Sequence, residues 1–401
     1  MEKYYIKSLI GEVAKGIERL IEQDVIKSDR SVILYGLDRY AFAIRTILSN
    51  KGFNNVECYI SDDEAAVVTV NQDIKNFACR YLNRTSDLIG AATLEERLKP
   101  FEDGVQILIA SQSYEQEKIK LEKFGYQENI HFFKVYDFVD EELESLFQNK
   151  TKMSLKEVQG VEKELLSYVD EICLKNDLRY WVCGGTLLGT IRHKGFIPWD
   201  DDVDIFLPWK DYQRFIEIFE EDEQFSMLGL GTSKVNDYSD MLAKVIDKRT
   251  LLSENIGTVR RIYPLGLDIF PLVGVPTDAE ERHLFFTRYQ ELNRAIWQDF
   301  YATSGSIEVF PKWYKEQKAF LGQYDFDNSE YVGVIGTPYG EKDYTHKEVY
   351  DKTLKMPFED IEVNVPVGYQ EYLENLYGKD WDIIPDESKR KSHHDIEAYW
   401  L

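Results

Sequence analysis

A compact group of acidic side chains is the first feature of this sequence that could do chemistry. Its members are Asp200, Asp201, Asp202 and Asp204. Two carboxylates about 4 Å apart repel each other by roughly 1 kcal/mol in water and roughly 4 kcal/mol at an effective dielectric constant of 20. A fold that packs several of them together therefore needs protons or cations, and a divalent cation is the simpler assumption. Oxygen ligands of this kind suit Mg²⁺ or Mn²⁺ rather than Zn²⁺.

The residues around the acids predict how they are held. Val203 and Ile205 alternate with Asp202 and Asp204, and side chains two positions apart in a strand share one face. We therefore expect Asp202 and Asp204 to lie on the same side of a strand. Asp200 and Asp201 are either further ligands or caps of the preceding loop.

A pair of glycines precedes the acids, where a strand is predicted to turn into a helix. The segment Tyr180-Trp181-Val182 is typical of a short strand, and Gly184, Gly185 and Thr186 follow it. Backbone N–H groups at such a turn can face an anion. The sequence therefore predicts a phosphate-binding turn at Gly184, Gly185 and Thr186, upstream of the acidic cluster.

One further aspartate is isolated in an apolar run. Asp268 is flanked by Leu267 and Ile269, and an isolated buried carboxylate is costly unless it is paired. Asp268 is therefore either a buried polar residue with a partner or a third metal ligand.

The run GGTLLGTIRHKGFIPWDDDVDIFLP, residues 184–208, resembles the signature of the LicD family. Shorter matching pieces follow at residues 244–250, 266–272 and 372–381, so the resemblance spans roughly residues 151–401. LicD proteins are phosphotransferases on a nucleotidyltransferase-like fold that move phosphocholine from CDP-choline onto glycans, and fukutin-type proteins are similar. The resemblance implies the same fold and the same chemistry here.

The resemblance also implies roles for individual residues. The metal ligands and catalytic residues would be Asp202, Asp204 and Asp268, with Mg²⁺ or Mn²⁺ as the cofactor. The donor's phosphates would be held by Gly184, Gly185 and Thr186, with Arg192, Lys194 and Lys244 stabilising charge on the phosphoryl oxygens. An acceptor hydroxyl, deprotonated by Asp268 or by metal coordination, would attack the phosphorus that bears choline, and CMP would leave.

Two aromatic residues near the acids are further candidates. A quaternary ammonium ion binds over aromatic faces, and Trp199 is the best placed tryptophan for a choline site because it adjoins the acidic strand. His193 either contacts phosphate and transfers a proton or is an incidental surface residue.

Composition limits the partners of this chain. Its 401 residues carry a formal net charge of −24, which disfavours nucleic acid and broad adhesion to an anionic membrane. There is no apolar run of about 18 residues and no apolar core of a signal peptide at the N-terminus. We expect a cytoplasmic protein without a transmembrane segment, with peripheral association at the inner face of the membrane left open, and with reduced cysteines.

The first 150 residues predict a domain of their own. Strands are expected at residues 31–36, 56–60, 105–110 and 131–133, with helices over 1–28, 39–50 and 114–124, which is the pattern of a Rossmann-like parallel sheet. A dinucleotide fingerprint is disfavoured because Asp38 stands where it needs a glycine. This domain would be structural, would form a homo-oligomer, or would bind a sugar or nucleotide.

Residues 151–401 are expected to form the catalytic domain, so the fold class is α/β plus α+β. A helix is predicted to begin at Ser154, because Glu157 completes a capping box. Helices are also expected over 208–221, 279–325 and 369–377, and strands at 243–246 and 265–270. The aromatic residues of 279–325 either pack internally or meet a lipid-linked acceptor. The basic tail at 389–394 either contacts phosphate or is solvated.

Several functions remain open at this point. The expected acceptor is a hydroxyl of a cell-surface glycan, namely teichoic acid, lipopolysaccharide or a capsule precursor. The same site could instead transfer phosphoethanolamine or glycerol phosphate from its CDP donor. A metal-dependent glycosyltransferase is less favoured because a single glycine turn precedes the acids. A catalytically silent scaffold is disfavoured by the intact acids.

Overall fold

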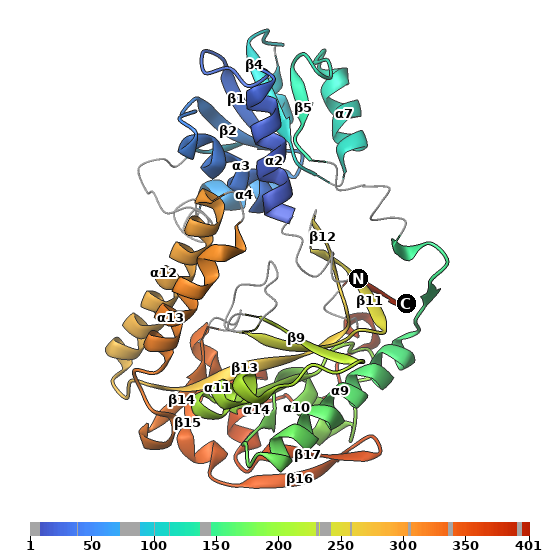
Figure 1. Cartoon of the computed structure of the whole chain (residues 1–401), viewed down its shortest axis with the longest axis vertical. Helices are drawn as coiled ribbons and strands as arrows, with labels where there is room; N and C mark the ends of the chain where they lie inside the picture. The colour runs from blue at the N-terminus through green and yellow to red at the C-terminus, as the bar shows by residue number, and fades with distance from the viewer. Residues whose placement is uncertain are drawn as a thin grey trace.

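The computed structural model of the chain describes residues 9–37, 39–72, 89–99, 101–111, 113–136, 146–229, 232, 242–256, 259–303, 306–335, 340–390 and 395–401. Asp38, Cys79, Lys391, His393 and His394 lie outside the described residues. Figure 1 places a parallel sheet at one end of the molecule and a mixed sheet at the other, with helices α12 (Ala279–Ala302) and α13 (Phe310–Leu321) along one side.

The first sheet is wholly parallel, as the sequence predicts. Its strands are β1 (Ser31–Tyr35), β2 (Val56–Ser61), β3 (Ala91–Thr93), β4 (Val105–Ile109) and β5 (Phe132–Lys134), in the order β3-β2-β1-β4-β5. The accompanying helices are α2 (Leu9–Glu22), α3 (Arg39–Asn50), α4 (Glu64–Gln72), α6 (Leu94–Leu98) and α7 (Tyr114–Lys123). Every residue of β4 is buried, which is typical of a strand covered on both faces.

The mixed sheet is built around β13 (Gly266–Val275). Parallel to it runs β8 (Asp204–Pro208), and β10 (Ala243–Asp247) and β14 (Tyr331–Val334) are antiparallel to it. The remaining strands are β7 (Trp181–Val182), β9 (Phe225–Gly229) and β15 (Tyr344–His346). Strand β13 is long and largely apolar, which is typical of a strand in the interior of a sheet. Its neighbours lie along both of its edges.

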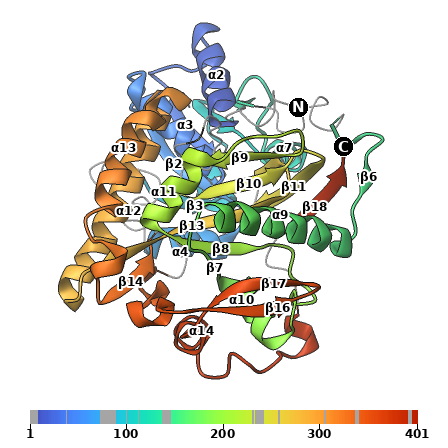
Figure 2. The same cartoon turned by 60° about the horizontal axis from the view of Figure 1, so that its bottom comes forward.

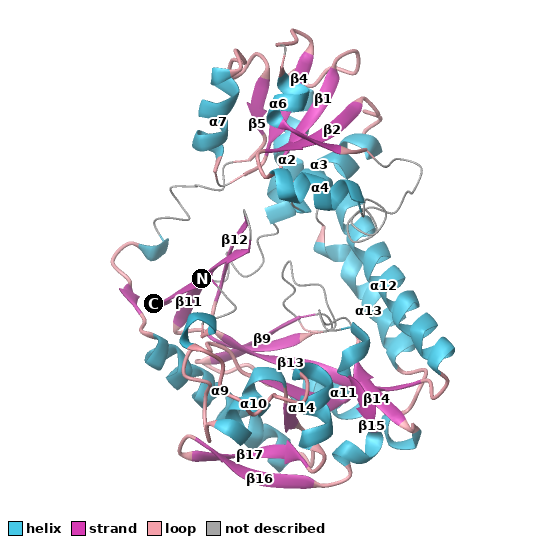
Figure 3. Cartoon of the chain, turned by 180° about the vertical axis from the view of Figure 1, so that it is seen from behind, coloured by secondary structure: helices cyan, strands magenta, loops and turns pink. Residues whose placement is uncertain are grey.

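Two smaller β structures complete the fold and were not predicted. An antiparallel sheet has the order β12-β11-β18-β6 and joins β12 (Val259–Tyr263), β11 (Thr250–Ile256), β18 (Asp395–Trp400) and β6 (Thr151–Lys152). A hairpin consists of β16 (Thr353–Phe358) and β17 (Ile361–Pro366). Figure 3 shows the antiparallel sheet between the other two.

Within the described residues, five helices surround the mixed sheet in addition to α13. They are α9 (Leu155–Lys175), α10 (Gly184–Arg192), α11 (Trp209–Ile218), α12 and α14 (Tyr369–Tyr377), and short 3₁₀ turns occur at Ile307–Val309, Phe326–Asn328, Gly340–Asp343, Lys347–Tyr350 and Glu387–Lys389. The predicted capping box of α9 is present: the Glu157 N–H donates to Ser154 Oγ at 3.3 Å and the Ser154 N–H to Glu157 Oε2 at 2.8 Å. Figure 2 shows α9 across the sheet, and it packs against β10 and β13.

The aromatic residues of 279–325 pack between two helices rather than along one. Phe285 stacks on Phe320 with ring centroids 4.6 Å apart, and Phe300 stacks on Phe310 at 5.1 Å. These contacts favour the internal-packing interpretation of this segment. Among the described residues, no helix combines the length and the apolar character needed to cross a membrane.

Candidate active site

Two of the predicted acids are neighbours across the mixed sheet. Asp204 opens β8 and is paired in register with Asp268 of β13, where the two strands run parallel. The Asp268 N–H donates to the carbonyl of Val203 at 3.0 Å. Residues at paired positions of adjacent strands project from the same face. The fold therefore brings together two carboxyl groups that are far apart in the sequence.

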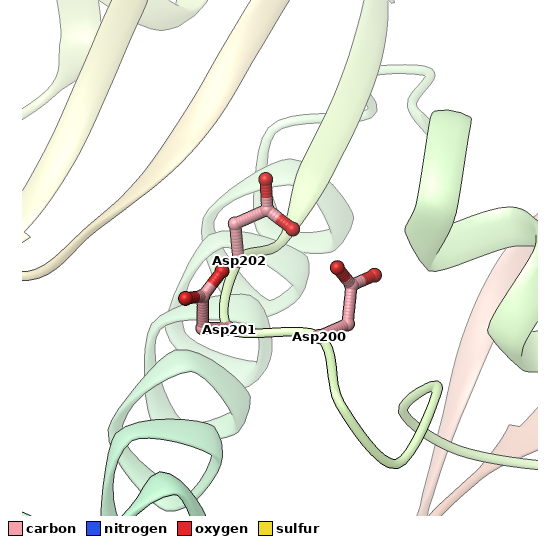
Figure 4. Close-up of side chains that lie close together, drawn as sticks. All are labelled: Asp200, Asp201 and Asp202. Atoms are coloured by element: carbon pink, nitrogen blue, oxygen red, sulfur yellow. The ribbon is translucent and has the colours of Figure 1, made fainter. Parts of the chain in front are cut away.

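The strand prediction for Asp202 is wrong in one respect. Because β8 begins at Asp204, Asp202 lies in the preceding loop instead of on the strand. That loop also holds Asp200 and Asp201, and one carboxyl oxygen from each of the three aspartates lies within 4.8 Å of the others. Asp200 and Asp201 are buried. Figure 4 shows the three side chains on this loop. The loop therefore offers oxygen ligands from Asp200 and Asp201 in addition to the predicted ligand Asp202.

The electrostatics of Asp204 reflect this crowding. Burial raises the pKa of its carboxyl well above the ordinary value, and the charges of Asp202 and Asp268 raise it further, while the Lys244 ammonium opposes them. Several carboxyl groups that face one another cannot all ionise cheaply without a cation. The donor set is all oxygen, which fits Mg²⁺ or Mn²⁺.

The glycine turn lies against these acids. Strand β7 pairs with β8, and α10 follows it directly at Gly184. Gly184 has φ of +51°, and a Cβ atom there would lie 3.3 Å from Asp204 Oδ2. A Cβ on Gly185 would lie 2.7 Å from Asp200 Oδ2. The glycines are therefore required because two carboxyl groups approach the backbone of the turn.

Thr186 joins the turn to the acidic strand. Its buried hydroxyl accepts a hydrogen bond from the Asp204 N–H at 2.9 Å, and the Cys183 N–H donates to the Asp204 carbonyl at 3.1 Å. The Gly184 N–H donates to the hydroxyl of the buried Tyr372 at 3.2 Å. Sequence reasoning missed this tyrosine, because its partner is distant in the chain.

Lys244 lies beside the third acid. It is paired with Asp268 across β10 and β13, and its Nζ is 2.6 Å from Asp268 Oδ1. The Lys244 ammonium also lies over the ring of Tyr263, 5.3 Å from its centroid. The structure thus brings this lysine into the acidic cluster.

A sixth acidic residue of this region, Glu162, was missed altogether. Glu162 is on α9, is only 1% exposed, and lies close enough for the Lys244, Asp202 and Asp268 charges to act on it. Burial is the largest cause that raises its pKa. The sequence offered one signal, namely a glutamate adjoining the apolar Val161 on the face of α9 that is buried.

Two of the predicted cations contact backbone carbonyls. Arg192 donates through Nη1 to the carbonyls of Trp381 and Ile383 at 3.0 and 3.2 Å. Lys194 has φ of +64°, and its Nζ donates to the carbonyl of Ile191 at 3.1 Å. Arg192 therefore fixes the segment that follows α14, and phosphate contact by either side chain stays a prediction.

Trp199 is half-buried and has a cation over its ring. The guanidinium carbon of Arg390 lies 5.6 Å from the ring centroid. The His193 ring meets Trp199 edge-on at 6.1 Å. Burial, followed by the charge of Arg192, lowers the pKa of His193. The tryptophan face is therefore already used for a cation–π contact within the chain.

Comparisons with known proteins give a consistent result. The sequence model of the LicD/FKTN/FKRP nucleotidyltransferase domain matches residues 177–250. The chain is 31% identical over 267 residues to the lipopolysaccharide cholinephosphotransferase LicD of Haemophilus influenzae, which covers 62% of this chain and 99% of that protein. It is 43% identical over 49 residues to the human ribitol 5-phosphate transferase FKRP, which covers 12% of this chain and 10% of that protein.

Proposed function

Because the chain belongs to the LicD family, we propose that it transfers phosphocholine from CDP-choline to a hydroxyl of a cell-surface glycan and releases CMP. The relatives support this proposal, since one is named a lipopolysaccharide cholinephosphotransferase and another a ribitol 5-phosphate transferase. Their common chemistry is transfer of a phosphorylated alcohol. The observation that carries the proposal is the in-register pair Asp204 and Asp268 beside the glycine turn.

The acidic residues would hold a divalent cation. Asp202, Asp204 and Asp268 are the proposed ligands, and Asp200 and Asp201 lie close enough to Asp202 to contribute. Bound Mg²⁺ or Mn²⁺ would neutralise charge on the donor's phosphates and on the phosphoryl group in transfer. The charges of Asp202 and Asp268 act on Asp204, and Asp204 and Asp268 are paired in register, which supports this assignment. Asp200, Asp201 and Asp202 form an adjoining group of oxygen ligands.

The chain's own residues would organise the transfer. The acceptor oxygen forms a bond to the phosphorus that bears choline, the bond from that phosphorus to CMP breaks, and Asp268 takes the proton. The turn at Gly184, Gly185 and Thr186 lies against Asp204 and Asp200 and would hold the donor's diphosphate. Lys244, already next to Asp268, would stabilise the charge on the phosphoryl oxygens.

Trp199 supports choline as the transferred alcohol. A ring that already accommodates the Arg390 guanidinium offers a suitable surface for a quaternary ammonium ion. The second candidate is another phospho-alcohol, such as phosphoethanolamine or glycerol phosphate, carried by its CDP donor at the same site. The ribitol 5-phosphate transferase among the relatives favours it, because that protein transfers an uncharged alcohol.

We assign residues 1–150 to a Rossmann-like accessory domain and residues 151–401 to a nucleotidyltransferase-like catalytic domain. The parallel order β3-β2-β1-β4-β5 supports the first assignment. Residue 151 begins β6, which pairs with β18 near the C-terminus and so supports a boundary there. The accessory domain would form the contacts of a homo-oligomer, and a lipid-linked glycan would be met by the catalytic domain.

A substrate panel tests the function. The protein is incubated with Mg²⁺ and CDP-choline, CDP-ethanolamine, CDP-glycerol or CDP-ribitol, and CMP release and thermal stabilisation are measured. We expect the fastest release and the largest stabilisation with CDP-choline, and loss of both in EDTA. Equal turnover with and without EDTA would contradict the proposed metal requirement. Turnover of only the donors with an uncharged alcohol would contradict choline as the transferred alcohol.

A further inference from the structure

Glu162 is a buried acidic residue to which the proposed transfer gives no role. The residue is 1% exposed, and its Oε2 atom accepts no hydrogen bond from the part of the chain that the structure describes. A buried carboxyl oxygen without a partner is costly, and such groups are rare in native proteins. Its burial therefore indicates a partner beyond the hydrogen bonds that the described residues make.

The neighbours of Glu162 identify that partner. Helix α9 packs against β10 and β13, which carry Lys244 and Asp268. Lys244 is the positive charge that acts on Glu162, while its ammonium is 2.6 Å from Asp268 Oδ1. Lysine carries a compact charge on a flexible four-carbon stem, so one ammonium can serve two nearby carboxyl groups in turn.

We propose that Glu162 is a positioning residue that receives the ammonium of Lys244 when Asp268 binds a divalent cation. The proposal rests on the proposed function, because it takes Asp268 as a metal ligand. An ammonium ion and a divalent cation on one carboxylate repel each other. Movement of the Lys244 ammonium from Asp268 to Glu162 removes that repulsion. The lysine side chain stays at the site, where it would face the donor's phosphates. The Oε2 atom of Glu162, which has no hydrogen-bond partner among the described residues, is then the acceptor that the ammonium reaches.

A double-mutant cycle on Mn²⁺ affinity tests this assignment. Dissociation constants for Mn²⁺ are measured by electron paramagnetic resonance for the parent, Glu162→Gln, Lys244→Met and the double variant. Glu162→Gln is expected to weaken Mn²⁺ binding about tenfold, because Lys244 then stays beside the cation. In the Lys244→Met background the same change is expected to alter the affinity by less than about twofold, because no lysine needs the acceptor.

Other outcomes separate the possible failures. Equal weakening in both backgrounds would mean that Glu162 acts only through its own charge, and this would overturn the proposal. An unchanged Mn²⁺ affinity of the single variant Glu162→Gln, which retains Lys244, would overturn it as well. Absence of Mn²⁺ binding by the parent would instead overturn the metal site itself. Turnover gives a second readout. Because Lys244 is proposed to stabilise charge on the phosphoryl oxygens during transfer, Glu162→Gln should lower kcat more than it raises KM at saturating Mn²⁺.

Two controls exclude a general effect on folding. Glu164→Gln changes a more exposed carboxylate of the same helix, which pairs with Arg249, and should leave Mn²⁺ affinity within about twofold. Glu162→Met fills a similar volume without a carboxyl group and should reproduce the loss seen with glutamine. All variants are melted in EDTA, where the absence of a metal should leave the Glu162 variants at least as stable as the parent.

Discussion

The hydroxyl of Thr186 accepts a hydrogen bond from the backbone N–H of Asp204 at 2.9 Å. Together with the hydrogen bond from the Cys183 N–H to the Asp204 carbonyl, this contact fixes the start of α10 to the first residue of β8. The glycine turn and the acidic strand are therefore held in one geometry. Thr186 is only 4% exposed, so its hydroxyl is shielded from water. The consequences of breaking this contact can be measured.

Thr186→Val keeps the shape of the side chain and removes the acceptor. The Asp204 N–H then loses its partner, and we expect the free energy of unfolding to fall by about 1–3 kcal/mol. Thr186→Ser retains the hydroxyl and should lose less. Urea unfolding of the three proteins measures this, and a valine variant as stable as the parent would show that the bond contributes nothing.

Gly185→Ala introduces a methyl group 2.7 Å from Asp200 Oδ2. The carboxyl group must move, so we expect Mn²⁺ affinity and CMP release to fall by roughly tenfold or more. Gly160→Ala is the matched control, because nothing lies within 4 Å of a Cβ at that helical position. It should stabilise the protein by about 0.5–1 kcal/mol and leave turnover unchanged. Similar losses in both variants would argue against the close approach of Asp200.

Trp199→Leu removes the aromatic face proposed for choline. A cation–π contact is worth roughly 0.5–2 kcal/mol, so KM for CDP-choline should rise by roughly 2- to 30-fold. KM for the uncharged CDP-glycerol should change by less than about twofold. Steady-state kinetics with both donors provide the test, and an equal rise for both would assign Trp199 to the nucleotide or to packing.

Arg390→Gln tests the same face of the Trp199 ring by removing the cation that lies over it. Arg390 lies over the Trp199 ring and competes with any cationic group for that face. The substitution should therefore lower KM for CDP-choline and leave KM for CDP-glycerol unchanged. A higher KM for both donors would instead assign Arg390 to phosphate binding.

His193 supplies a prediction on pH. Burial and then the charge of Arg192 lower its pKa in the folded protein, below the ordinary value of about 6.5. The unfolded chain then binds the proton more tightly, so this residue stabilises the fold above about pH 6.5 and the stabilisation is lost as the pH falls through the lowered value. NMR titration of the His193 ring, with His193→Gln for assignment, measures the pKa. A value above 6.5 would contradict the burial argument.

The sequence predicted much of the fold because its signals are local. The capping box at Ser154 and Glu157 set the start of α9, and helix 39–50 coincided with α3. The antiparallel sheet was missed because β11 pairs with β18, which lies far along the chain. Nothing in either segment alone announces that pairing.

The candidate site also contains residues that local sequence signals reveal and residues that only the tertiary fold brings together. Asp204 and Asp268 were found from their apolar flanks, and the sheet register then placed them side by side. Asp202 was wrongly placed on the strand, because the alternation of acidic and apolar residues begins at Asp202, whereas β8 begins only at Asp204. Glu162 and Tyr372 were missed because their relation to the acids and the glycine turn exists only across the tertiary fold.

Asp204 is the residue on which metal-dependent turnover should depend most directly. CMP release from CDP-choline is measured against Mg²⁺ concentration for the parent, for Asp204→Asn, and for Asp360→Asn, whose carboxylate is 75% exposed and pairs with Lys163. We predict that Asp204→Asn lowers kcat by about a thousandfold or more and abolishes the Mg²⁺ dependence, while Asp360→Asn behaves as the parent. Parental turnover by Asp204→Asn would contradict the account.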